Sequence, residues 1–95
     1  MLNYAIFLMG ENFPMDYDGD VVLQGFFVTK RVEAENEEVA REMAIAGIKS
    51  TPIIASSILL AGVTEPTIQV KVVHLLPDHN KMKDTEFVFF PMEDD

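Results

Sequence analysis

Apolar and polar positions change their period several times along the chain, and each change predicts a secondary-structure element. In residues 2–9, LNYAIFLM, both sides of a two-residue repeat are apolar, which is typical of a central strand. Residues 20–34 are rich in β-branched and aromatic side chains, and Gly25 divides them, so we expect a second strand with a bulge or kink. We expect the polar residues 10–19 to form the loop between these strands.

The period lengthens to that of an α-helix after residue 35. Asn36 is a good N-cap, and Glu37 and Glu38 suit the positive end of the helix dipole. The apolar residues that follow recur at helical spacing: Val39, Ala40, Met43, Ala44 and Gly47. This segment therefore predicts an amphipathic helix.

A second, shorter helix is predicted immediately afterwards. Thr51 is a candidate cap, Pro52 suits the first helical position, and Gly62 is a natural stop. The apolar run IIASSILL is also compatible with a buried strand, so residues 53–61 have two interpretations.

The two-residue period returns in the last third of the chain. Residues 67–77, TIQVKVVHLLP, alternate between apolar and polar, and TEFVFFP near the end indicates a last strand. The order β-β-α-α-β-β predicts one α+β domain over residues 1–95. We expect two layers: a mostly antiparallel four-stranded sheet with the helices on one face.

Composition and charge narrow the functional classes. The chain has no cysteine, which excludes disulfides, thiolate metal sites and a cysteine nucleophile. Its net charge of −9 repels nucleic-acid phosphates and anionic membranes. The apolar N-terminal run is short and lacks the basic flank of a signal peptide. We expect a soluble cytoplasmic protein that binds neither nucleic acid nor membrane; the charge would suit a basic protein partner, although solubility alone is its commoner explanation.

The sheet has more apolar surface than two helices can cover. The first strand is apolar on both sides, and the last has Phe87 and Phe89 on one side with Val88 and Phe90 on the other. A second apolar face on a small monomer is a binding surface or an aggregation hazard. We therefore predict a homodimer formed face to face, with Phe7, Phe87 and Phe89 as candidate interface residues.

The stretch DYDGD, residues 16–20, has two interpretations. Asp16, Asp18 and Asp20 resemble the first ligands of a calcium-binding loop. If Asp16 is position one of such a loop, Val21 stands where glycine is needed and Phe27 stands where a bidentate glutamate is needed. Asp18-Gly19 is a common turn dipeptide. We therefore predict a turn and no metal site.

No recognisable catalytic or cofactor motif is present. His74 and His79 lack the fixed spacing that would organise a zinc site, and no serine lies in a nucleophile-elbow motif. The glycines match no phosphate-binding loop. We expect no cofactor.

Lys30 is the one local irregularity in the pattern. It interrupts the more apolar side of the second strand, where a buried ammonium is costly unless it is paired. It either extends past the rim of the sheet or binds an anion or partner, with Glu42 or Glu86 as internal alternatives. Lys30, Thr29 and His74 are the candidate ligand-binding residues.

The stretch GFFVTKRVEAENEEVAREMA resembles small bacterial proteins of unknown function that carry the pattern G-F-[YF]-x-T-[RK]-x-V-E-A. The matching residues are Gly25, Phe26, Phe27, Thr29, Lys30, Val32, Glu33 and Ala34. The resemblance implies no activity. The same stretch is similar to the strand-to-helix junction of ferredoxin-like domains, but the element order differs from theirs.

These observations favour a non-enzymatic, self-associating interaction domain. A more specific version is an inhibitor or immunity-type protein whose carboxylates meet a basic partner: Asp16, Asp18, Asp20, Glu35, Glu37 and Glu38. The alternative is a small enzyme or ligand-binding protein with a pocket near Lys30 at a dimer interface.

Overall fold

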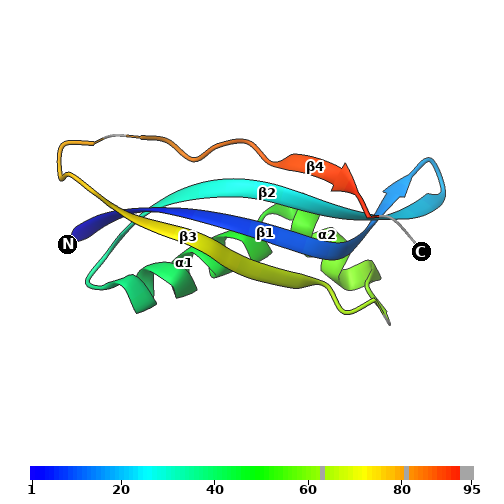
Figure 1. Ribbon diagram of the computed structural model, residues 1–95. Helices are drawn as coiled ribbons and strands as arrows, with labels where there is room; N and C mark the ends of the chain where they lie inside the picture. Colours follow the sequence, from blue (N-terminus) through cyan, green and yellow to red (C-terminus); the bar gives the residue numbers. More distant parts are fainter. Residues whose placement is uncertain (63, 81, 93–95) are drawn as a thin grey trace.

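The computed structural model describes residues 1–62, 64–80 and 82–92. They form a four-stranded antiparallel sheet with two helices packed on it (Figure 1). The elements in chain order are β1 (Leu2–Tyr17), β2 (Asp20–Ala34), α1 (Glu37–Lys49), α2 (Pro52–Leu60), β3 (Thr67–Leu76) and β4 (Val88–Pro91). The strands lie in the spatial order β3-β1-β2-β4. The predicted α+β class and element order are confirmed, and residues 52–60 are helical.

The long β1–β2 hairpin differs from the predicted elements. The expected loop over residues 10–19 is wrong, because β1 continues to Tyr17 and pairs with β2 on both sides of a bulge between Gly10 and Phe13. Only Asp18 and Gly19 form the turn, with φ angles of 53° and 93°, as a two-residue hairpin turn requires. Pairing with β2 holds the polar residues of this stretch in the sheet. The pattern of apolar and polar residues along the stretch does not predict this pairing.

Both helices begin where the capping residues predict. The Asn36 side chain accepts a hydrogen bond from the Val39 backbone N–H at 2.9 Å, and α2 starts at Pro52. The Thr51 hydroxyl caps nothing and instead donates to the Gly47 carbonyl at 3.1 Å. Neither described helix alone is long and apolar enough to cross a membrane; α1 and α2 pass that test only as a pair bent by 76°.

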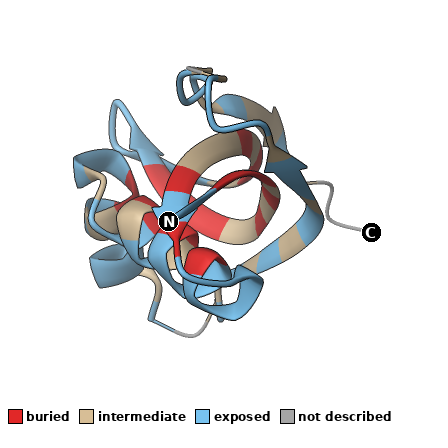
Figure 2. Cartoon of the chain, turned by 90° about the vertical axis from the view of Figure 1, so that its left-hand side faces the viewer, coloured by how far each residue is buried: buried red, intermediate tan, exposed pale blue. Residues whose placement is uncertain are grey.

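The hydrophobic core lies between the sheet and the helices (Figure 2). Alternate residues of the central strands face the helices, with Leu8 opposite Val28 and Gly10 opposite Phe26. The helices contribute small and branched side chains that are almost fully buried: Ala40, Ala44, Ile48 and Ile54. The alanines of α1 let its backbone come close to the sheet.

A buried polar contact attaches α2 to the end of β1. Ser57 is only 2% exposed, and its hydroxyl donates a hydrogen bond to the carbonyl oxygen of Pro14 at 2.7 Å. The larger apolar residues that follow it, Ile58, Leu59 and Leu60, are exposed instead. This helix therefore buries Ile54 and a serine, while three of its other large apolar side chains face outward.

We expect Ser57→Ala to lower the free energy of unfolding by about 1–2 kcal/mol, because it removes the donor that the buried Pro14 carbonyl uses. Chemical denaturation followed by circular dichroism measures the change. The exposed neighbour is the matched control, and Ser56→Ala should stay within about 0.5 kcal/mol of wild type. Equal losses in both variants would show that this hydrogen bond has no special role.

Candidate functional site

The sheet face that the helices leave uncovered, here called the open face, carries a row of three phenylalanine rings. Phe7 of β1 stacks on Phe27 of β2 with ring centroids 5.6 Å apart and an angle of 7° between the rings. Phe27 in turn contacts Phe90 of β4 at 5.1 Å and 32°. The rings are half-buried, partly because they cover one another. The row therefore crosses three of the four strands.

Gly25 leaves the space that the ring of Phe90 occupies at one end of this aromatic row. A Cβ atom at Gly25 would lie 2.2 Å from the ring of Phe90, so only glycine lets that ring lie flat on β2. Phe90 stands opposite Gly25 in the β2–β4 pairing. The glycine that divides the β2 sequence thus positions an aromatic side chain on the open face.

The connection from β3 to β4 covers one end of the open face. It turns near the N-terminal end of β1 (Figure 1), where the Asn3 side-chain amide donates to the carbonyls of Asn80 at 2.9 Å and Pro77 at 3.3 Å. Arg31 donates to the Asn3 side-chain oxygen at 3.1 Å. The polar end of the face is therefore closed by the chain itself, and the aromatic row lies beyond it.

A hollow of about 350 Å³ lies on the open face beside the aromatic row. It brings together two candidate ligand-binding residues, Thr29 and His74, with Phe7, a candidate interface residue. Its full lining is Ala5, Phe7, Thr29, Val72, His74, Leu76 and Met82. Apolar side chains form most of its wall, so it suits an apolar group better than an anion.

Lys30 lies on the opposite side of the sheet from this hollow. Its side chain is 19% exposed, and its Nζ lies 3.3 Å from the Oδ2 of Asp84 and 5.8 Å from the centre of the Phe87 ring. Its partner within the chain is therefore Asp84, and not Glu42 or Glu86. Lys30 does interrupt the apolar, helix-facing side of β2, as its place in the sequence predicts. Its charge is balanced by the ion pair with Asp84 at the rim of the sheet.

The three candidate interface phenylalanines do not share one face. Phe87 and Phe89 pack on the helix-facing side against Phe26, with ring centroids 5.2 and 6.1 Å from it. Only Phe7 belongs to the open face. Phe27 and Phe90 lie beside it on the open face, and neither was among the candidate interface residues. The alternation of side chains within each strand shows which residues of that strand share a side. It does not show which side of β4 lies on the same sheet face as a given side of β1.

The six acidic residues predicted to meet a basic partner form two separate groups. Asp16, Asp18 and Asp20, the hairpin carboxylates, surround the β1–β2 turn, and Asp16 accepts a hydrogen bond from the Gly19 N–H at 2.8 Å. This contact confirms the predicted turn. The glutamates that precede and begin α1 lie at the other end of the molecule, which is 45 Å long (Figure 1). A partner that meets both groups would have to extend along most of the length of the molecule.

The described residues offer contact surfaces more than reactive groups. Within residues 1–62, 64–80 and 82–92, no three His, Asp or Glu side chains are grouped to hold a metal ion. The hollow on the open face has the Thr29 hydroxyl and the His74 imidazole as its polar side-chain groups. Comparison of the chain with protein-family models, with curated proteins and with solved structures finds no match.

Proposed function

We propose that this chain is a non-enzymatic interaction domain that self-associates as a dimer through its open face. The observation that carries the proposal is the aromatic row of Phe7, Phe27 and Phe90 on a sheet face that neither described helix covers. Two neighbouring apolar side chains extend this surface, since Val72 is 41% and Val88 is 63% exposed. Aromatic anchors of this kind dominate the energy of many interfaces.

The distribution of charge is compatible with a dimer at this face. Arg31 and Glu33, which lie on the open-face side of β2, pair with each other at 3.5 Å. The hairpin carboxylates and the glutamates that precede and begin α1 lie near the two ends of the molecule (Figure 1). The aromatic row lies within the paired strands between them. Charges separated by more than about 8 Å are largely screened at physiological salt. The net charge of −9 therefore opposes this contact only weakly.

Face-to-face packing is better supported than pairing of strand edges. β3 is an edge strand, but its register with β1 shifts where Phe7 faces Val72 and Leu8 faces Val70, which leaves Lys71 as an extra residue. A bulge and a lysine are two common means of preventing edge pairing. The other edge, β4, has only four residues. The open face is thus the larger available surface.

We expect wild type to have the mass of a dimer in multi-angle light scattering, at low and at high salt, because apolar contacts hold it. Val88→Asp should raise the dissociation constant at least about tenfold, because it introduces a charge into the aromatic surface. Leu75→Asp is the matched control: Leu75 is equally exposed (63%) but faces the helix side, opposite Tyr4. It should leave the mass unchanged.

Two results would contradict a dimer at the open face. One is a wild-type monomer at every concentration tested. The other is an equal loss of mass in Val88→Asp and Leu75→Asp. In the first case the hollow lined by Thr29 and His74 becomes the better-supported feature. The second candidate function is then a binding protein for a small, mainly apolar ligand.

A further inference from the structure

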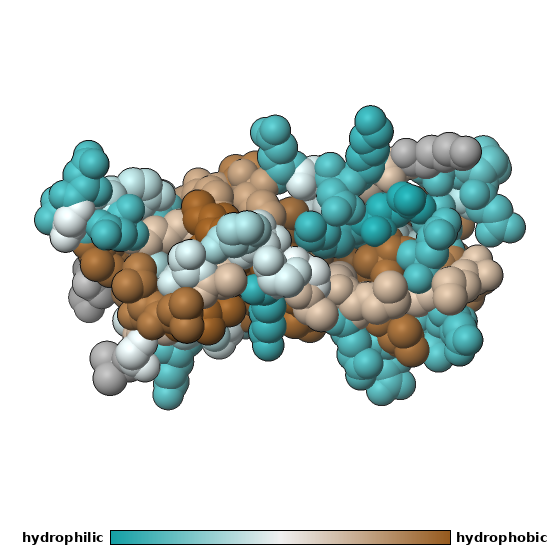
Figure 3. All heavy atoms as spheres, turned by 180° about the vertical axis from the view of Figure 1, so that it is seen from behind, coloured by the Kyte–Doolittle hydropathy of each residue, from teal (hydrophilic) through white to brown (hydrophobic). Residues whose placement is uncertain are grey.

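α2 is an apolar helix that the rest of the chain hardly covers. Among its nine residues only Ile54 and Ser57 are buried. The exposed fractions of its large side chains are high: Ile53 49%, Ile58 39%, Leu59 88% and Leu60 51%. Seen from the helix side, apolar surface gathers over this end of the molecule (Figure 3). Exposed apolar surface of this kind on a small chain is typical of a contact site.

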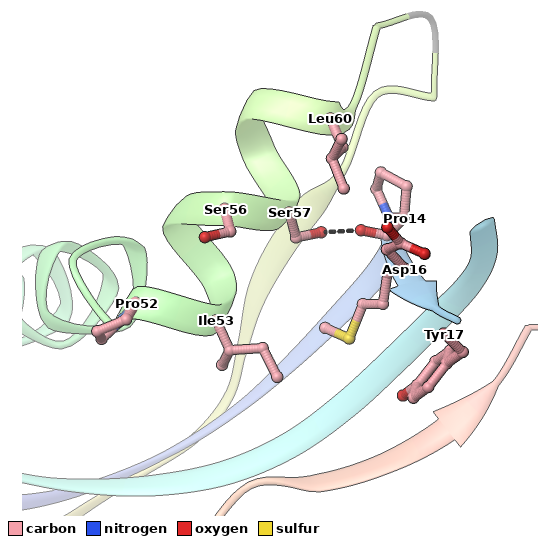
Figure 4. A pocket seen from close by; sticks show the side chains of 9 residues that line it. Pro14, Asp16, Tyr17, Pro52, Ile53, Ser56, Ser57 and Leu60 are labelled. Atoms are coloured by element: carbon pink, nitrogen blue, oxygen red, sulfur yellow. Dashed lines mark hydrogen bonds between the residues drawn. The ribbon is translucent and has the colours of Figure 1, made fainter. Parts of the chain in front are cut away.

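A groove runs between α2 and the end of β1. We call it the α2 groove; its volume is about 350 Å³, and its walls include Ile53, Ser56 and Leu60 from α2 and Pro14, Asp16 and Tyr17 from β1. Figure 4 shows Ile53 and Leu60 extending from the helix toward the strand, with Asp16 and Tyr17 on the opposite side. The Ser57–Pro14 hydrogen bond forms its floor and holds the two walls together.

The β1 wall of the groove is acidic. Asp16 lines it directly, and the other hairpin carboxylates follow at the exposed turn. The described part of the chain forms three ion pairs, and none involves these carboxylates: Lys30–Asp84, Arg31–Glu33 and Arg41–Glu37. An apolar channel is thus bordered by negative charge on one side.

We propose that the α2 groove docks a cationic amphipathic helix of another protein. The apolar side chains of that helix lie against Ile53 and Leu60, while its lysines or arginines meet the hairpin carboxylates. The negative charge of the hairpin carboxylates favours a cationic helix over the other possible occupants of the groove. A second copy of the chain offers no cationic helix, because α1 has three glutamates against Arg41 and Lys49 and α2 has no charged residue. An anionic membrane would be repelled by the hairpin carboxylates. This contact is separate from the open face.

The first test uses a fluorescein-labelled peptide of leucine and lysine, about 14 residues or roughly four helical turns long, with its leucines on one helical face. Fluorescence anisotropy should show saturable binding to the full chain. A shuffled peptide whose leucines point in all directions should bind much more weakly. A peptide with glutamate in place of lysine should not bind, because the hairpin carboxylates repel it.

Variants of the chain locate the binding site. Leu60→Ser should raise the dissociation constant of the peptide about tenfold, because it removes an apolar wall of the groove. Met43→Ser is the matched control, since Met43 is exposed to a similar extent on the other helix (47% against 51%). It should change binding less than twofold. Thermal unfolding of both variants checks that they remain folded.

A charge-matched pair of variants tests the acidic border. Asp16→Asn, Asp18→Asn and Asp20→Asn together should weaken binding about fivefold and reduce its dependence on salt. Asparagine keeps the side-chain acceptor that Asp16 presents to Gly19. The control, Glu35→Gln with Glu38→Gln and Glu42→Gln, removes the same number of charges elsewhere and should change binding less than twofold.

Several results would overturn the proposal. Equal weakening by both charge variants would show attraction by net charge alone, and equal binding of the shuffled peptide would show that no helical face is recognised. If Leu60→Ser instead lowers the mass in light scattering, the occupant is a second copy. If wild type sediments with neutral phosphatidylcholine vesicles and Leu60→Ser does not, the occupant is a membrane. Light scattering of Val88→Asp tests the open face separately.

Discussion

Gly10→Ala is expected to lower the free energy of unfolding by about 3 kcal/mol, although it adds a single methyl group. A Cβ atom at Gly10 would lie 2.1 Å from a ring carbon of Phe26, which is fully buried. The ring cannot move aside, because Phe13 and Phe87 pack against it with centroids 5.1 and 5.2 Å away. Urea denaturation followed by circular dichroism measures the loss.

A second glycine serves as the control for this substitution. Gly47 lies inside α1, and a Cβ atom there would have nothing within 4 Å. Gly47→Ala should therefore raise the free energy of unfolding by about 0.5–1 kcal/mol through helix propensity. In the background of Phe26→Leu, Gly10→Ala should cost less than in wild type, because the smaller side chain leaves space for the methyl group. A change of the same sign and size at both glycines would contradict the contact between Gly10 and Phe26.

Phe26→Ala is expected to lower the free energy of unfolding by about 4 kcal/mol, a large part of what a domain of this size usually has. Its ring is fully buried and contacts three other phenylalanines: Phe13, Phe87 and Phe89. Removing it opens a cavity among the rings of Phe13 in β1, Phe89 in β4 and Phe87 just before β4, so the site cannot collapse by a small local shift. The unfolding midpoint in urea measures the effect.

The next residue in the chain is the control for Phe26→Ala. Phe27 points to the open face and is only half-buried, so Phe27→Ala should cost about 1–2 kcal/mol in the monomer. Its effect should grow with protein concentration if the aromatic row forms a dimer interface, because association stabilises the folded state. The loss in Phe26→Ala should not depend on concentration in this way. Equal, concentration-independent losses would contradict the different roles of the two faces.

Much of the fold follows from short-range features of the chain. The two-residue period predicted strands, the Asn36 cap predicted the start of α1, and Pro52 predicted the start of α2. The Asp18-Gly19 dipeptide predicted a turn. Each of these features acts within a few residues, so no knowledge of the neighbouring elements was needed. The extension of β1 to Tyr17 was missed because its hydrogen-bond partners lie in β2.

The candidate site was predicted only in part. Phe7, Thr29 and His74 do line one hollow, because they share one side of three adjacent strands. Lys30 does not join them, since neighbouring residues of a strand point to opposite faces. The exposed apolar surface of α2 was not foreseen either. An apolar helix looks like core in a sequence, and no local signal shows how little of it the sheet can cover.

Short-range features of the chain identified the strands and the starts of the helices, because backbone geometry sets those periods and caps locally. The tertiary contacts set how the sides of different strands combine and where a bulge exchanges the sides within β1 and β3. The pairing of β4 with β2 places Phe89 against Phe26 in the core and Phe90 over Gly25 on the open face. That register depends on contacts between residues more than sixty positions apart in the chain, such as Phe26 with Phe89, and a period read along one strand carries no information about them.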